Sequence, residues 1–151
     1  MKPLVVLSAS FLLIVAFAKY FTGIYDVPLC GNRAMCIMLL FTALGHFKYT
    51  KGMVMMMPDF IPFKKLLVYV TGLIEIILGI LLLFPDYRYL AGFATITFFI
   101  IIVPANVTAA FKHIDYIRAD YNGLKSGYLW FRIPMQLYLL SWVFYFSIYS
   151  V

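Results

Sequence analysis

The sequence predicts an all-α membrane protein with five transmembrane helices in a single domain, residues 1–151. The first observation is composition: 65% of the 151 residues are hydrophobic and 12% are charged, whereas soluble domains carry roughly 25% charged residues. The second is the recurrence of apolar runs close to the roughly 20 residues that cross a hydrocarbon core. The net charge of +6 therefore bears on membrane orientation rather than on nucleic-acid binding.

The first two predicted spans are residues 3–21 and 34–49, joined by a connection over residues 22–33. A signal peptide is the alternative for the first span, because Ala16-Phe17-Ala18 has the small-x-small pattern of a cleavage site. The run is longer than the roughly 7–15 apolar residues of a signal peptide, which favours a retained helix. Residues 50–64 combine two prolines and a glycine with many apolar side chains. We expect this segment to lie in the membrane interface or to fold back over the bundle.

Three further spans complete the predicted bundle: residues 65–84, 89–110 and 129–149. The turn at Pro85-Asp86 is short, so the third and fourth helices should be antiparallel neighbours. Pro104 removes one backbone hydrogen bond and predicts a kink in the fourth helix. Pro134 is tolerable if it lies in the first turn of the last helix. Residues 111–127 form the most polar stretch of the chain.

Lysine and arginine are concentrated on one side of these five spans. Positive residues favour the cytoplasm, which predicts a cytoplasmic N-terminus and a C-terminus on the outside. The cytoplasmic side would carry Lys2, Lys48, Lys51, Lys64, Lys65, Lys112, Arg118 and Lys125, with Arg132 just inside the last span. The other side would carry Lys19, Arg33 and Arg88.

Glu75, the only glutamate in the chain, lies ten residues past Lys65, which places it roughly 15 Å deep at about 1.5 Å per residue. A carboxylate at this depth is expensive and indicates a cavity, a partner charge or a proton path. The other strongly polar residues of the spans fall nearer the same, cytoplasmic end. We therefore predict a ligand-binding pocket open to the cytoplasm, with Glu75 as its floor. Its candidate residues are His46, Thr71, Glu75, Asn106, Arg132 and Gln136.

Each candidate also has a purely structural interpretation. Glu75 could form a buried ion pair with Arg132, although such pairs stabilise poorly once desolvation is counted. Arg132 could instead extend to the lipid headgroups. His46 could cap its helix or face the interface. Asn106 could satisfy the backbone that the preceding proline exposes, and Gln136 could join two helices.

The two cysteines leave a disulfide open, since a folded connection could bring the Cα atoms of Cys30 and Cys36 within about 7 Å. The sequence contains no Cys-x-x-Cys pair, no glycine-rich phosphate loop and no cluster of histidines and carboxylates suited to a metal. We therefore expect no metal site and no catalytic residues, and a non-enzymatic role is favoured. A membrane enzyme with Glu75 or His46 as acid–base catalyst is the weakest alternative.

Six short motifs lie in order over about residues 34–145. They are Gly45-His46-Phe47, Met57-Pro58-Asp59-Phe60-Ile61-Pro62, Val68-Tyr69-Val70-Thr71-Gly72-Leu73-Ile74-Glu75, Leu90-Ala91-Gly92, Pro104-Ala105-Asn106 and Arg132-Ile133-Pro134-Met135-Gln136. Their order and spacing resemble the DoxX-like family of small bacterial membrane proteins. The resemblance implies a bacterial inner-membrane protein with a four-helix transmembrane bundle, formed by the second to fifth spans, plus an additional N-terminal helix. It implies a site that includes His46, Glu75, Asn106, Arg132 and Gln136.

Some members of the DoxX-like family are associated with redox systems, including a thiosulfate–quinone oxidoreductase. The resemblance therefore makes quinone the candidate cofactor and a redox enzyme the candidate protein partner, besides membrane lipid. With the pocket, it predicts a non-catalytic subunit or a module that binds a small hydrophobic ligand, either quinone or lipid. The alternative is a small, proton-coupled transporter that uses Glu75 and would require a homodimer. No redox cysteine pair falls within the motifs, which argues against thiol exchange.

Overall fold

The structure is a computed structural model that describes residues 2–23, 26–121 and 127–150. Within these ranges all regular elements are helices, as predicted, and Asp115 and Asp120 form one isolated antiparallel bridge. The elements are α1 (Lys2–Thr22), α2 (Val27–Lys48), α3 (Thr50–Met56), α4 (Lys64–Leu81), α5 (Pro85–Ile101), α6 (Val103–Phe111), α7 (Gly127–Val143) and the π-helical segment η1 (Phe144–Tyr149).

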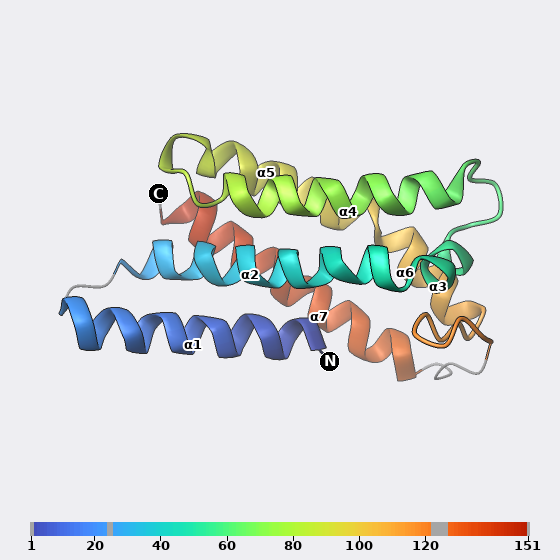
Figure 1. The fold of residues 1–151 in the computed structure, drawn as a ribbon, viewed down its shortest axis with the longest axis horizontal. Helices are drawn as coiled ribbons and strands as arrows, with labels where there is room; N and C mark the ends of the chain where they lie inside the picture. Colours follow the sequence, from blue (N-terminus) through green and yellow to red (C-terminus); the bar gives the residue numbers. More distant parts are fainter. Residues whose placement is uncertain (1, 24–25, 122–126, 151) are drawn as a thin grey trace.

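The long helices run back and forth along one axis (Figure 1). The packing of α2 is most extensive against α4 on one side and α1 on the other. The α4–α5 turn is tight, and these two helices are antiparallel neighbours as predicted. Side chains from α1, α2, α4, α5 and α7 meet in the largest buried cluster, which includes Leu7, Met38, Leu78, Phe98 and Leu139. Below, "the α3 end" means the end of the bundle where α2 finishes and α4 begins.

Three helical segments are long and apolar enough to cross a membrane: Lys2–Phe21, Val27–Lys48 and Pro85–Phe111. The last of these combines α5 and α6. α4 has 18 residues but carries three charged groups, Lys64, Lys65 and Glu75. The final helix divides into α7, with 17 residues, and η1, with six.

α2 begins at Val27, seven residues before the predicted start at residue 34. The reason is a helix cap: Asp26 Oδ1 accepts a hydrogen bond from the Leu29 backbone N–H at 3.0 Å, and Pro28 lies in the first turn. Cys30 and Cys36 consequently lie six residues apart on one helix, a rise of about 9 Å. That spacing is too long for a disulfide, and both cysteines are free and buried.

Residues 50–64 fold back over the α3 end, the second of the two arrangements expected for this segment. α3 packs against α4 and α6, and Gly52 lies so close to the Tyr116 carbonyl that a Cβ would collide with it. The following loop is tied down by Asp59, whose carboxylate contacts Lys112 Nζ at 2.6 Å and Lys64 Nζ at 3.2 Å. These ammonium groups hold the pKa of the Asp59 carboxyl below its usual range.

Two prolines occupy different positions in their helices. The kink predicted at Pro104 is confirmed: α5 ends at Ile101, α6 begins at Val103, and Pro104 lies in the first turn of α6. Pro134 lies inside α7, which continues past it, and not in the first turn, where a proline is tolerated most readily.

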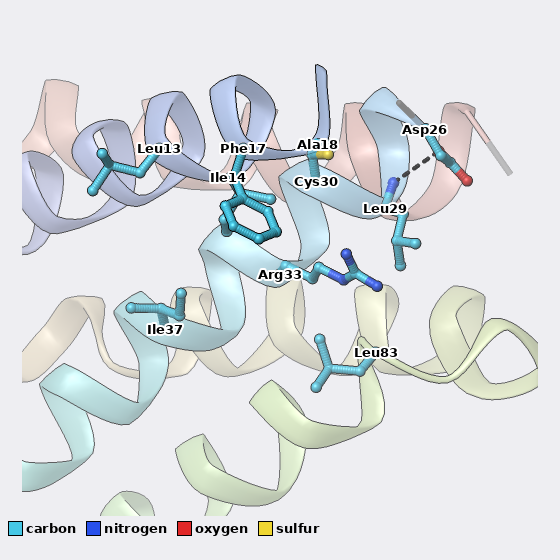
Figure 2. Close-up of a pocket in the computed structure, with 10 residues that line it drawn as sticks. All are labelled: Leu13, Ile14, Phe17, Ala18, Asp26, Leu29, Cys30, Arg33, Ile37 and Leu83. Carbon is cyan, nitrogen blue, oxygen red and sulfur yellow. Dashed lines mark hydrogen bonds between the residues drawn. The ribbon is translucent and has the colours of Figure 1, made fainter. Parts of the chain in front are cut away.

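A groove of about 810 Å³ lies between α1 and the first half of α2, with Leu83 from the turn after α4 at one edge (Figure 2). Most of its lining is apolar. The charged exceptions are Asp26 and Arg33, both of which belong to the α2 end that is remote from α3. We call this feature the α1–α2 groove.

Candidate functional site

A cavity of about 470 Å³ lies at the α3 end of the bundle. All six residues predicted for the pocket line it, and they come from α2, α4, α6 and α7. They are His46, Thr71, Glu75, Asn106, Arg132 and Gln136. The structure thus brings the predicted residues together around one space. Whether that space holds a ligand stays a prediction.

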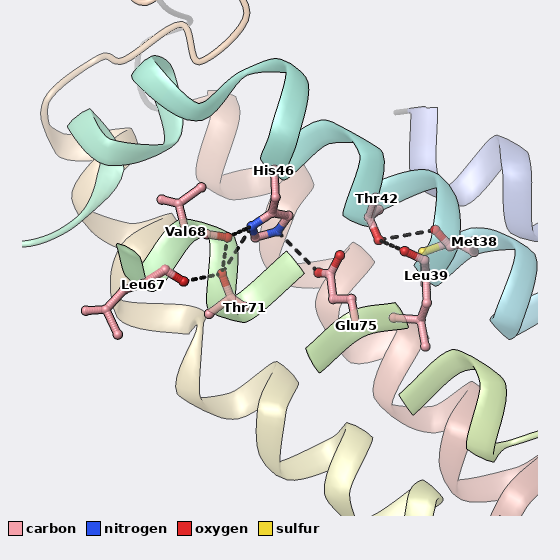
Figure 3. Close-up of polar contacts among 8 residues, drawn as sticks. All are labelled: Met38, Leu39, Thr42, His46, Leu67, Val68, Thr71 and Glu75. Carbon is pink, nitrogen blue, oxygen red and sulfur yellow. Dashed lines mark hydrogen bonds and ion pairs between the residues drawn. The ribbon is translucent and has the colours of Figure 1, made fainter. Parts of the chain in front are cut away.

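His46 and Glu75 form the polar centre of the cavity (Figure 3). His46 Nε2 lies 3.5 Å from Glu75 Oε1. The close approach of α2 and α4 depends on Gly72, because a Cβ at this position would lie 2.8 Å from the Cβ of His46. The pair is therefore created by helix packing and not by sequence proximity.

His46 has polar neighbours at both ring nitrogens. Nδ1 lies 2.9 Å from the Val68 carbonyl oxygen and 3.1 Å from Thr71 Oγ1, while Nε2 faces Glu75 Oε1 at 3.5 Å. A hydrogen on Nδ1 donates to the Val68 carbonyl, and a hydrogen on Nε2 is directed at the Glu75 carboxylate. The imidazolium form carries both hydrogens, so the ring has an acceptor on each side.

The second oxygen of Glu75 is the unusual atom of the site. Glu75 is only 4% exposed, and among the described residues no group donates a hydrogen bond to its buried Oε2. A buried carboxylate oxygen left unpaired costs several kcal/mol, roughly. Glu75 is also one of the residues that line the cavity.

The structure pairs Glu75 with His46 rather than with Arg132. The alternative of a Glu75–Arg132 ion pair is therefore wrong. The physical reason is depth: Arg132 is the sixth residue of α7 whereas Glu75 is the twelfth residue of α4, both counted from the α3 end. This corresponds to a difference of about 9 Å along the bundle. Arg132 lines the cavity nearer its outer part.

Gln136 has a structural role within the same cavity. Its Nε2 donates to the Phe99 carbonyl oxygen at 2.8 Å. Phe99 lies in the last turn of α5, where carbonyls lack a partner within the helix. Gln136 thus joins α7 to the end of α5, the helix-joining role that was one of its two interpretations. Asn106 lines the cavity from α6.

Several lining residues were not predicted. Thr42 precedes His46 by one turn on the cavity side of α2, and this i,i+4 spacing could have identified it. Tyr116 reaches the cavity from the polar connection, which has no hydrophobic periodicity from which its position could be predicted. Five methionines from four segments form much of the apolar wall. They are Met38, Met53, Met56, Met57 and Met135.

A second buried polar group, which we call the Asn32 cluster, lies at the opposite end of the bundle. Asn32 is 0% exposed and donates from Nδ2 to the carbonyls of Pro28 at 3.0 Å and Phe146 at 2.8 Å. Its Oδ1 accepts a hydrogen bond from Ser147 Oγ at 2.5 Å. The expectation that strongly polar groups collect only in one half was therefore wrong, because Asn32 had been assigned to a loop rather than to α2.

The family model for the domain of unknown function DUF8561 matches residues 35–147 of this chain. Because the match covers most of the chain, the protein belongs to that family. The match includes all six residues predicted for the pocket and leaves α1 and the first turns of α2 outside. No curated protein and no solved structure matches the chain.

Proposed function

We propose that the chain is a multi-pass membrane protein with five spans: α1, α2, α4, α5 with α6, and α7 with η1. Three of these segments have spanning length and apolarity by themselves. The 18 residues of α4 measure about 27 Å, close to the roughly 30 Å hydrocarbon core. Its two charged residues at the start, Lys64 and Lys65, can extend to the headgroups. Many large apolar side chains on all five segments face outward, as lipid contact requires.

The proposed orientation puts the α3 end in the cytoplasm, with the N-terminus inside and the C-terminus outside. The basic residues among those described divide unevenly between the two ends, which supports this orientation. At the α3 end are Lys2, Lys48, Lys51, Lys64, Lys65, Lys112, Arg118 and Arg132, and at the other end are Lys19, Arg33 and Arg88. Lys125 lies outside the described residues. The resemblance to DoxX-like proteins supports the bacterial inner membrane as the location.

In this membrane protein the cavity binds a small amphipathic ligand, either a quinol or a lipid, and the chain acts as a non-catalytic subunit or binding module. The observation that carries the proposal is the buried, unpartnered Oε2 of Glu75 beside the cavity. A hydroxyl of the ligand donates to this oxygen, while the methionine wall accommodates an apolar body because thioether side chains are flexible and polarisable. The volume of about 470 Å³ lies in the range of small-molecule sites, roughly 300–1,000 Å³. A quinone-dependent redox enzyme is the corresponding protein partner.

Direct binding tests this function. The purified protein is titrated with decyl-ubiquinol, and separately its co-purified lipids are identified by native mass spectrometry. We expect binding by the wild type and a loss of about tenfold in Glu75→Gln, since a charge-assisted hydrogen bond is worth about 1.5–3 kcal/mol. Thr95→Val is the matched control, because Thr95 is buried but donates within α5 and does not line the cavity. A wild type that carries no lipid and binds no quinol contradicts the proposal.

Proton-coupled transport is the second candidate. It is favoured by the buried contact between His46 and Glu75 and by the interrupted helix at Pro104, features that resemble proton sites and broken helices of transporters. The test is proton flux into liposomes that contain the purified protein. Flux that equals that of empty liposomes, or that persists unchanged in Glu75→Gln, excludes this candidate.

A further inference from the structure

The α1–α2 groove has charge at one end and is apolar along its length. Asp26 caps α2 and Arg33 is the seventh residue of that helix, so both lie within about 9 Å of its start. Ile37, farther along the groove, lies about 15 Å from the start of α2, and the facing wall from α1 includes Leu13, Ile14 and Phe17 (Figure 2). A groove with a charged end near the membrane surface and an apolar end inside has the polarity of one lipid molecule.

The two charges at this end are not neutralised by each other. Among the described residues, no ion pair includes Arg33, and none joins it to Asp26. Asp26 uses one carboxylate oxygen, Oδ1, to cap the helix. A guanidinium beside apolar walls in a membrane is costly without an anion. Its flat fork of donors matches the geometry of a phosphate.

We propose that the α1–α2 groove binds one phospholipid with an amino headgroup, such as phosphatidylethanolamine, from the leaflet remote from α3. Its phosphate binds Arg33, its ammonium lies toward Asp26, and an acyl chain occupies the groove between Phe17 and Ile37. The charges are complementary: the Arg33 guanidinium matches the lipid phosphate, and the Asp26 carboxylate matches the lipid ammonium. This complementarity favours an amino headgroup over other phospholipid headgroups. This inference goes beyond the cavity ligand and rests only on the proposed membrane placement.

The groove also assigns a role to α1. The family match begins at residue 35, so α1, Asp26 and Arg33 all lie outside it. Without α1 the groove would lose the wall that includes Leu13, Ile14 and Phe17. The N-terminal helix therefore adds a lipid site that the matched domain does not contain by itself.

Native mass spectrometry of the full chain in detergent tests the proposal with three added lipids: phosphatidylethanolamine, phosphatidylglycerol and diacylglycerol. We expect one phosphatidylethanolamine to be retained at least about tenfold more tightly than diacylglycerol, which lacks the phosphate. In Arg33→Gln this difference disappears, whereas Arg33→Lys retains part of it because a cation remains. Lys19→Gln, a basic residue near the same end that does not line the groove, leaves it unchanged.

The Asp26→Asn variant tests the headgroup separately. Asparagine caps helices as well as aspartate does, so α2 should remain intact while the negative charge is lost. The wild type should retain phosphatidylethanolamine more tightly than phosphatidylglycerol. We expect Asp26→Asn to retain the two lipids about equally. Melting curves confirm that each variant is folded, and unchanged decyl-ubiquinol binding separates this site from the cavity.

Three results would overturn the lipid site. The first is retention of phosphatidylethanolamine by Arg33→Gln at the wild-type level. The second is equal stabilisation by inorganic phosphate, which would mean that no lipid is needed. The third is a dimer whose copies cross-link through a cysteine substituted at Leu13, because a second chain would then cover the groove.

Discussion

The His46–Glu75 cavity and the Asn32 cluster are both polar and both buried, but they differ in how completely their hydrogen bonds are satisfied. Every side-chain polar atom of Asn32 has a partner, from α2 itself or from η1. Glu75, in contrast, has one carboxylate oxygen near His46 and another without a described donor, next to about 470 Å³ of space. The closed polar network joins helices, whereas the open one has an unpaired acceptor with which a bound molecule can interact.

This difference makes opposite predictions for stability. Removing a member of the closed network should leave other buried groups unpaired, which is the expensive outcome. Removing the charge from the open network should leave nothing newly unpaired. The following four changes test the comparison, in order of decreasing expected effect.

The largest effect is expected from Asn32→Leu. It removes the donor to the Phe146 carbonyl and the acceptor of the Ser147 hydroxyl, so stability should fall by about 2–3 kcal/mol. Thermal unfolding in detergent measures this loss. Thr95→Val, which removes one hydrogen bond within a single helix, is the control and should have a smaller effect. If both variants melt alike, the Asn32 cluster does not join helices as described.

The next effect is expected from Gly72→Ala. The new Cβ would lie 2.8 Å from the His46 Cβ, so α2 and α4 must separate, at a cost of about 1–2 kcal/mol. Decyl-ubiquinol binding should weaken together with the His46–Glu75 contact. Gly45→Ala is a matched control, since its Cβ would meet only the Met53 methyl at an ordinary 3.5 Å. Equal behaviour of the two variants would show that the close approach at Gly72 is unnecessary.

A smaller change, of opposite sign, is expected from Glu75→Gln. Since Glu75 Oε2 has no described partner, the substitution breaks no complete network and removes a buried charge. Stability should stay the same or rise by up to about 1 kcal/mol, while ligand binding falls. Unfolding and binding are measured on the same preparation. A loss of stability as large as that of Asn32→Leu would mean that Glu75 is a structural residue.

The smallest effect concerns the loop that covers the α3 end. The hydrogen bonds and charges of Lys112 and Lys64 lower the pKa of Asp59 from its usual 3.8. For a carboxyl with a lowered pKa, the stabilisation is present above the ordinary value and is lost as pH falls through the folded value. We therefore expect the protection factors for hydrogen exchange in residues 57–63, which correct for the intrinsic pH dependence of exchange, to fall only below about pH 4 in the wild type. Asp59→Asn should show the lower protection already at neutral pH. Protection factors that are the same in both proteins at every pH would contradict this role.

His46, Glu75 and Asn32 show which features could be predicted from the sequence and which could not. His46 and Glu75 were placed in one pocket because depth in an apolar helix follows from a fixed rise per residue. Their direct contact was not predictable, because it depends on the glycine at position 72 that lets α2 approach α4. Asn32 was missed because Gly31 and Pro28 resemble a loop, while the cap at Asp26 in fact starts the helix.

The helical class, the long apolar segments, the break at Pro104 and six of the residues that line the cavity could be predicted from the sequence alone. These follow from hydrophobic composition, from the missing proline N–H and from helix rise, which are properties of a single segment. Only the tertiary structure decided that Glu75 faces His46 instead of Arg132, that Gln136 satisfies the end of α5, and that Asn32 reaches η1. These contacts depend on the distance between neighbouring helices and on the rotation of each helix about its axis. Neither quantity can be read from the sequence of a single helix.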